Sequence, residues 1–206
     1  VIPMRPLADI MRPRSIEDVV GQSHIIGEDK LITNLVKSGN IPNMIFYGPS
    51  GTGKTTVANI CAEVCGKKLY KLNATNASTK DIKEIAADLG SFETRNGVML
   101  YLDEIQNFNK KQQQSLLEYI ENGSITLIAS TTENPYFYVY NAILSRSTVF
   151  EFKPVSPEEM EKAILRGFER ISFENGIQYT VSPEAVQYIS RGVGGDVRKC
   201  LNTVEL

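Results

Sequence analysis

Gly48-Pro49-Ser50-Gly51-Thr52-Gly53-Lys54-Thr55 is the stretch that decides the fold of this chain. It matches the pattern G-x-x-x-x-G-K-[ST], which requires a strand before it and a helix after it. An apolar run of strand length covers residues 44–47, and a helical pattern begins after Gly53. Because both flanks fit, we interpret the stretch as a phosphate-binding loop (P-loop) rather than as a glycine-rich surface turn.

The chemistry of this loop comes from its backbone and from two side chains. Glycines let backbone N–H groups turn inward around phosphate oxygens, and the helix that follows adds the positive end of its dipole. Lys54 is expected to neutralise the β and γ phosphates, and the Thr55 hydroxyl is expected to bind Mg²⁺. The predicted nucleotide-contacting residues here are Gly48, Pro49, Ser50, Gly51, Thr52, Gly53, Lys54, Thr55 and Thr56.

A second element is the apolar run at residues 98–102, which ends in Asp103 and Glu104. Buried parallel strands are continuous apolar runs, and ligands collect at their carboxyl ends. We therefore expect Asp103 to face the phosphate site and to hold Mg²⁺. Glu104 is expected to point elsewhere on the pleat and to act as the general base that polarises water. Solvated carboxylates without a role are the alternative.

Apolar runs alternate with helical patterns up to about residue 152, which predicts an α/β domain with a mainly parallel, five-stranded sheet flanked by helices. The strands are expected at 44–47, 68–73, 98–102, 125–130 and 148–152. Helices are expected after Gly53, near Ser78 and near Asn109, and the last two carry Asp81 and Gln112 in the spacing of capping boxes.

Only helical patterns follow Lys153-Pro154. Ser156 and Ser182 each precede a proline and first-turn acids, and Asp196 is a third candidate N-cap. We predict two domains, residues 1–153 for nucleotide binding and 154–206 for a small helical lid. The chain starts at Val1 and keeps helical spacing up to its last residue, so we expect a piece of a longer protein whose lid is truncated at its C-terminal end.

Two further stretches contain polar residues that could act on a nucleotide. Thr132 or Asn134, at the end of the predicted strand 125–130, could orient the attacking water, and spacing does not choose between them or exclude a simple turn. Arg146 precedes the last predicted strand and could stabilise phosphate charge as an arginine finger, although a lone exposed arginine is more often solvated or salt-bridged. Arg198 has the same two interpretations.

Composition limits the class of protein. The chain of 206 residues has 24 Asp and Glu against 22 Lys and Arg, a net charge of −2. Any nucleic-acid contact must therefore come from a local patch. No apolar run approaches the roughly 18 residues needed to span a bilayer, so no membrane association is expected. The three cysteines are interpreted as reduced thiols of a cytoplasmic protein, with a metal site a minor alternative.

Four aromatic side chains cluster shortly before Arg146, namely Tyr136, Phe137, Tyr138 and Tyr140. They could stack on unpaired bases, but core or subunit packing is the favoured interpretation.

Taken together, these motifs resemble the AAA+ ATPases, and within them the clamp-loader-like replication-associated recombination protein A family, which is related to the eukaryotic Werner helicase-interacting protein. The resemblance covers nearly the whole chain. Its narrowest signals are Phe108-Asn109-Lys110 with Gln112-Gln113, and Thr131-Thr132-Glu133-Asn134-Pro135. Ser50 stands where a second proline is usual in the family, at a position that contributes only backbone.

The resemblance implies further roles. Thr132 matches sensor 1, Arg146 matches a finger that reaches a neighbouring subunit's ATP, and Arg198 matches sensor 2 on the lid. The segment with Arg12, Pro13, Val19 and Val20 resembles the wall of an adenine pocket. Asn73 resembles a switch residue that restrains the catalytic glutamate.

It also implies a function. Family members are homo-oligomeric, Mg²⁺- and DNA-dependent ATPases of replication, recombination and repair, acting at stalled forks in the bacterial cytosol, associated with the nucleoid and with single-strand-binding protein. We expect ATP and Mg²⁺ as ligands and DNA junctions or ends as partners. The family's oligomerisation domain lies beyond the matching region, so we expect the 206-residue chain alone to be mainly monomeric. A clamp-loader subunit and a nucleotide-gated scaffold with little turnover are the alternatives.

Overall fold

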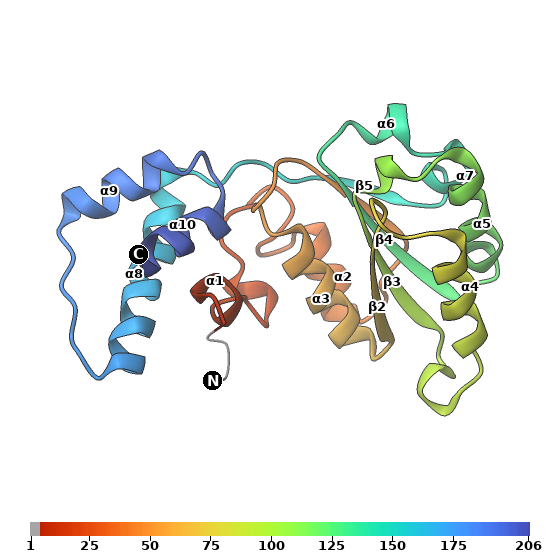
Figure 1. Ribbon diagram of the computed structural model, residues 1–206, viewed down its shortest axis with the longest axis horizontal. Coiled ribbons are helices and arrows are strands. Elements are labelled where there is room, and N and C mark those ends of the chain that lie inside the picture. Colours follow the sequence, from red (N-terminus) through yellow and green to blue (C-terminus); the bar gives the residue numbers. More distant parts are fainter. Residues whose placement is uncertain (1–4) are drawn as a thin grey trace.

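A sheet of five parallel strands forms the centre of the computed structural model, which describes residues 5–206 (Figure 1). The strand order is β2-β3-β4-β1-β5, and every pairing is parallel. The strands are β1 (Met44–Tyr47), β2 (Lys68–Asn73), β3 (Val98–Asp103), β4 (Ile125–Thr131) and β5 (Thr148–Glu151). The predicted α/β class and strands are confirmed, with shifts of one residue at three carboxyl ends.

Helices cover both faces of the sheet because its central strands are apolar on both sides. Met44 and Phe46 of β1 pack into one core with α2 (Leu31–Ser38) and α3 (Lys54–Cys65). Ile45 points the other way, into a second core with α4 (Thr79–Asp88) and α5 (Lys110–Glu121). Figure 1 shows these helix pairs on opposite sides of the sheet.

The helix starts follow local side-chain chemistry. Ser78 with Asp81, and Asn109 with Gln112, form the two predicted capping boxes at the starts of α4 and α5. Further along, serine caps start α8 (Pro157–Asn175) and α9 (Pro183–Gly192), and Asp196 caps α10 (Val197–Glu205). Side-chain oxygens at these positions satisfy N–H groups that would otherwise lack partners, which is why the starts could be predicted.

A third core holds the C-terminal helices together. Met160 and Ile164 of α8 pack there with Cys200 and Val204 of α10. Leu7 of the short N-terminal helix α1 (Leu7–Ile10) joins this core, and its backbone N–H donates to the Glu205 carboxylate at 3.1 Å. The N-terminal segment therefore packs on the lid helices, although it precedes the sheet in the chain (Figure 1).

Several elements have no counterpart in the sequence prediction. They are the helices α1, α2, α6 (Pro135–Tyr138) and α7 (Asn141–Leu144) and the 3₁₀ helices Ile16–Asp18, Phe92–Thr94 and Ile105–Asn107. Helix α6 carries three of the clustered aromatic residues, and they are 64% (Tyr136), 81% (Phe137) and 50% (Tyr138) exposed. The expectation of core packing is therefore wrong for these three side chains, and packing against another subunit stays a prediction.

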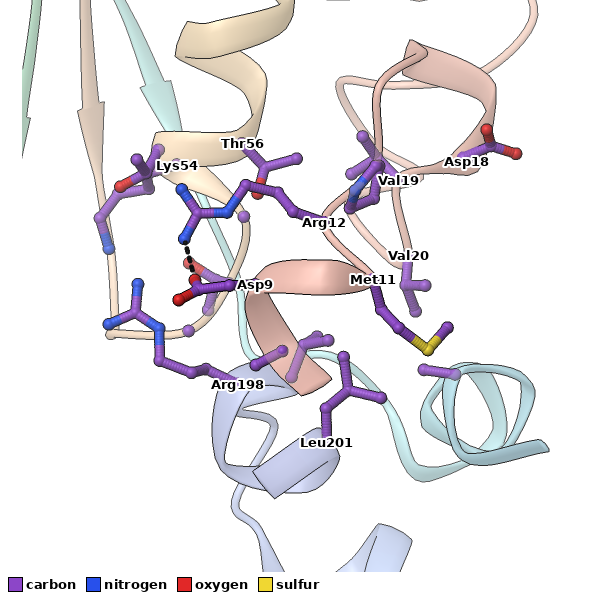
Figure 2. A pocket seen from close by; sticks show the side chains of 18 of the residues that line it. Asp9, Met11, Arg12, Asp18, Val19, Val20, Lys54, Thr56, Arg198 and Leu201 are labelled. Atoms are coloured by element: carbon purple, nitrogen blue, oxygen red, sulfur yellow. Dashed lines mark hydrogen bonds and ion pairs between the residues drawn. The ribbon is translucent and has the colours of Figure 1, made fainter. Parts of the chain in front are cut away.

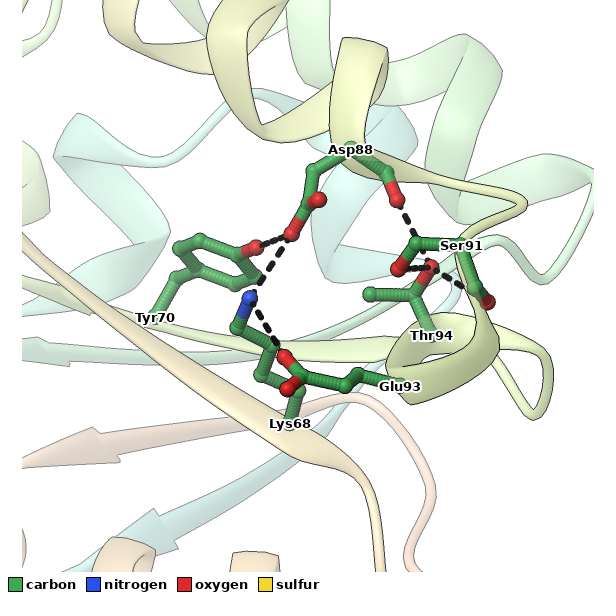
Figure 3. Close-up of polar contacts among 6 residues, drawn as sticks. All are labelled: Lys68, Tyr70, Asp88, Ser91, Glu93 and Thr94. Atoms are coloured by element: carbon green, nitrogen blue, oxygen red, sulfur yellow. Dashed lines mark hydrogen bonds and ion pairs between the residues drawn. The ribbon is translucent and has the colours of Figure 1, made fainter.

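Edge strand β2 is anchored to the end of α4 and to the 3₁₀ helix Phe92–Thr94 by a polar cluster (Figure 3). The Lys68 ammonium contacts the carboxylates of Asp88 at 2.9 Å and Glu93 at 3.2 Å. The Tyr70 hydroxyl donates to the same Asp88 carboxylate, and Thr94 donates to the Asp88 carbonyl at 2.7 Å. Charged side chains on an edge strand also disfavour pairing with a strand of another chain. Within residues 5–206, no helix is long and apolar enough to cross a membrane.

Candidate nucleotide site

The carboxyl ends of β1, β4 and β3 meet at one edge of the sheet, and the P-loop leaves β1 at that edge. A cavity of about 990 Å³ lies between the P-loop, the N-terminal segment and the lid, which is large for a small-molecule site. Its lining includes Arg12, Pro13, Val19, Val20, Ser50, Gly51, Thr52, Gly53, Lys54, Thr55, Thr56, Tyr101, Asp103, Glu104, Val197 and Arg198.

Two P-loop glycines are required by close contacts. Gly48 has φ +142°, and a Cβ atom there would lie 2.0 Å from the Phe152 carbonyl oxygen. Gly51 has φ +70°, and a Cβ atom there would lie 1.8 Å from Asp196 Oδ1 at the start of α10. The Val197 N–H donates to the Gly51 carbonyl at 2.9 Å. The P-loop is therefore in direct contact with the lid.

Replacing Gly51 with Ala is expected to push the start of α10 away from the P-loop and to weaken nucleotide binding. Gly66→Ala is the matched control, because Gly66 has φ +63° and nothing lies within 4 Å of its added Cβ. A left-handed alanine alone costs about 1–2 kcal/mol. We expect thermal unfolding to show a larger loss for Gly51→Ala, with weaker binding of a fluorescent ATP analogue for that variant only. Equal losses and unchanged binding would contradict the lid contact.

Lys54 lies beneath the loop with 9% of its surface exposed. Its ammonium donates to the carbonyl oxygens of Gly48 and Pro49, both at 2.7 Å. Burial lowers the pKa of Lys54, whereas the charges of Asp103 and Glu104 act in the opposite direction. The side chain thus presents a positive charge at the base of the cavity.

A chain of hydroxyl groups connects the two predicted magnesium ligands. The Thr55 hydroxyl lies 3.0 Å from the Tyr101 hydroxyl, which donates to Ser130 at 2.9 Å, and Ser130 donates to the Asp103 carboxylate. Burial raises the pKa of Tyr101 to about 12, so this hydroxyl stays protonated. Hydroxyl and carboxylate oxygens suit Mg²⁺, and those of Thr55 and Asp103 both line the cavity. The sequence prediction missed Tyr101 and Ser130.

Glu104 adopts a left-handed backbone conformation, with φ 57° and ψ 45°. This turn ends the pleat at Asp103, so the alternation of the strand does not continue. Asp103 and Glu104 consequently both line the same cavity. The expectation that Glu104 points elsewhere on the pleat is wrong, and the reason is this single backbone turn.

The predicted adenine wall lies on the opposite side of the cavity. Figure 2 shows Arg12 and Val19 on the N-terminal segment beside the P-loop, Val20 turned toward Met11, and Arg198 entering from α10. The Arg12 guanidinium is paired with Asp9 at 3.1 Å. An apolar wall with arginines near its edge could hold a purine ring above a phosphate chain.

Gln22, which the sequence prediction did not single out, is buried behind this wall and has φ 60°. Its side-chain amide donates to the carbonyls of Thr52 at 3.1 Å and Lys153 at 2.7 Å, and it accepts from the Lys153 N–H at 2.8 Å. A single side chain thus connects the N-terminal segment, the P-loop and Lys153, the last residue before the lid.

The strand-end candidates occupy different places. Thr132 is exposed and does not line the cavity, and Asn134 caps α6 by accepting from the Tyr136 N–H at 3.0 Å. Thr131, the residue before Thr132, is buried, and its hydroxyl donates to Gln106 at 2.6 Å. Gln106 in turn donates to the Glu104 carboxylate. The hydroxyl coupled to Glu104 therefore belongs to Thr131.

Arg146 lies outside the cavity. Its side chain is 41% exposed, forms an ion pair with Glu121 at 2.6 Å and donates to the Ala142 carbonyl at 2.8 Å. The structure therefore does not bring it to the P-loop of its own chain.

Asn73 and the three cysteines do not line the nucleotide cavity. The Asn73 side chain accepts from the Thr75 N–H at 2.9 Å, in a local turn. The three cysteines are free, and burial raises the pKa of both Cys61 and Cys200 to about 12. Such thiols are unreactive at neutral pH.

Comparison with known proteins agrees with this geometry. The family model described as "ATPase family associated with various cellular activities (AAA)" matches residues 44–155, from β1 to the start of the lid. This chain belongs to the AAA family. The matched region contains the P-loop, Asp103, Glu104 and Arg146, whereas the adenine wall and Arg198 lie outside it.

Sequence similarity to individual relatives indicates which AAA proteins this chain resembles. It is 40% identical to replication-associated recombination protein A of Bacillus subtilis, over 98% of this chain and 48% of that protein. The same-named protein of Escherichia coli K12 is 36% identical over 98% of this chain and 46% of its own length. ATPase WRNIP1 of Dictyostelium discoideum is 34% identical, over 23% of its length. The chain thus spans about half the length of its bacterial relatives, and the predicted resemblance is confirmed.

The AAA fold is also found in solved structures. The Holliday junction branch migration motor RuvB of Thermotoga maritima superimposes with a TM-score of 0.76 at 22% identity, over 95% of this chain and 64% of that one. This likeness concerns the fold alone.

Proposed function

We propose that the chain is the Mg²⁺-dependent ATP-hydrolysing part of its protein. The observation that carries this proposal is the joint presence of the P-loop, Asp103 and Glu104 in one cavity. A chain that only bound nucleotide would not need a second carboxylate beside the phosphate site. This observation favours turnover over the nucleotide-gated scaffold.

Each side chain has a distinct task in this proposal. Lys54 neutralises the β and γ phosphates, while Thr55 and Asp103 hold Mg²⁺. The bound ion would offset the charge that develops on the phosphate oxygens. Glu104 accepts a proton from the attacking water as general base, and the wall with Arg12, Pro13, Val19 and Val20 holds the adenine. Arg198 contributes charge from the lid.

Lys54→Ala is expected to remove most nucleotide affinity, because the β and γ phosphates would lose the ammonium group at the base of the cavity. Titration with a fluorescent ATP analogue measures this loss. Lys83→Ala is the control, since Lys83 is an exposed lysine on α4 outside the cavity, and it should bind like the parent. Equal affinity of Lys54→Ala and the control would show that the P-loop assignment is wrong.

The nucleotide cycle is proposed to move the lid, residues 154–206, against the nucleotide-binding domain, residues 1–153. The hydrogen bond from the Val197 N–H to the Gly51 carbonyl would transmit this motion. Gln22 would hold the P-loop to Lys153, the last residue before the lid. The names of the bacterial relatives support a role in replication and recombination. We propose that the motion remodels DNA, or proteins bound to it, at stalled forks, in the cytoplasm at the nucleoid. ATP turnover with and without forked, gapped and blunt duplex DNA tests this role, and turnover that no DNA changes would count against it.

Assembly belongs to the same proposal. The full-length protein is proposed to be a homo-oligomer in which Arg146 of one subunit serves the ATP of its neighbour. The 206-residue chain alone is then expected to be mainly monomeric and a slow ATPase. Single-strand-binding protein is the proposed partner at forks.

A further inference from the structure

One side chain joins Glu104 to the rigid end of β4. Gln106, in the 3₁₀ helix Ile105–Asn107, donates through Nε2 to Oε2 of Glu104. Its Oε1 accepts the Thr131 hydroxyl at 2.6 Å. Both polar ends of the Gln106 amide are therefore occupied.

The direction of these hydrogen bonds follows from Glu104. A carboxylate only accepts hydrogen bonds, so the NH₂ end of the Gln106 amide must face Glu104. The carbonyl end then faces Thr131, whose hydroxyl donates to Gln106 Oε1 while its Oγ1 also accepts from the Glu133 N–H at 3.0 Å.

Thr131 is a firm anchor. It is 1% exposed, pairs with Tyr47 of β1, and its carbonyl accepts from the N–H of Gly48, the first P-loop residue, at 3.1 Å. The contacts thus run from the start of the P-loop through the end of β4 to one oxygen of Glu104.

We propose that Gln106 is a positioning residue that holds the Glu104 carboxylate for ATP hydrolysis. This inference rests on the proposed function of Glu104 as general base. Gln106 binds Oε2 of Glu104 and leaves the other carboxylate oxygen of Glu104, Oε1, to accept the proton of the attacking water. Without this contact, three rotatable bonds let the carboxylate drift, and a displacement of about 1 Å can cost about 10²-fold in rate.

The test compares Gln106 variants in the full-length protein. Gln106→Leu keeps the bulk but loses both hydrogen bonds, so kcat is expected to fall about 10- to 10²-fold while affinity for an ATP analogue is unchanged. Gln106→His keeps one donor and one acceptor nitrogen, and is expected to recover most of kcat. Gln114→Ala, at an exposed glutamine on α5, is the control that should match the parent. Thermal unfolding checks that each variant is folded.

A double-mutant cycle then separates positioning from a general structural effect. Thr131→Val should lower kcat in the same way, and the double variant should be no slower than Gln106→Leu, because both changes break one chain of contacts. The inference would be overturned if kcat were unchanged in Gln106→Leu or if nucleotide affinity fell in parallel with kcat. It would also be overturned if Gln106→His did not recover kcat, or if the two losses multiplied in the double variant. If the parent does not hydrolyse ATP, or Glu104→Gln is as fast as the parent, the proposed function itself fails, so the two failures are distinguishable.

Discussion

Full-length protein carrying Arg146→Ala is expected to hydrolyse ATP about 10³- to 10⁵-fold more slowly than the parent, which is the range for loss of an arginine finger. Assembly and nucleotide binding should remain normal. Arg146 lies outside the cavity of its own chain and its side chain is 41% exposed, so the proposed neighbouring subunit would reach it once its ion pair with Glu121 opens. Phosphate release measures the rate, and gel filtration measures the assembly.

Mixing two inactive variants tests whether Arg146 acts between subunits. Full-length Arg146→Ala has an intact P-loop, and full-length Lys54→Ala has an intact Arg146. At mixed interfaces each supplies what the other lacks, so the mixture should regain turnover that neither variant shows alone. No recovery, with mixed assembly demonstrated, would contradict the role of Arg146 in a neighbour's site.

Glu104→Gln is expected to slow turnover about 10²- to 10⁴-fold while leaving nucleotide affinity unchanged, because the amide keeps the shape of the side chain but does not accept a proton. Single-turnover hydrolysis measures the chemical step, and titration with an ATP analogue measures binding. Glu118→Gln, at an exposed carboxylate on α5, is the matched control. If Glu104→Gln and the control turn over ATP equally fast, another group activates the water.

Local chemistry explains why much of the fold could be predicted. The P-loop pattern, the apolar runs of the strands, and caps such as Ser78 and Asn109 each depend on residues within a few positions. The short helices α6 and α7 and the N-terminal helix α1 are four residues long, which is too short for a periodic pattern. Leu7 packs on the lid through a contact with the far end of the chain.

The details of the site depend on contacts that the sequence does not encode locally. The alternation of the strand predicts Glu104 on the other face from Asp103, whereas one left-handed residue brings both residues to the lining of the cavity. Gln106 and Thr131 are partners only because the register of the sheet places the end of β4 beside β3. The resemblance pointed to Thr132, which the structure places one residue beyond the buried hydroxyl.

Phosphate release from Mg²⁺-ATP, measured side by side for the full-length parent and Lys54→Ala, tests most directly that this chain hydrolyses ATP at its P-loop. We expect sustained release by the parent and only background release by the variant, after thermal unfolding curves have shown that both proteins are folded. Equal release by the two proteins, or none by the assembled parent in the presence of forked DNA, would contradict it.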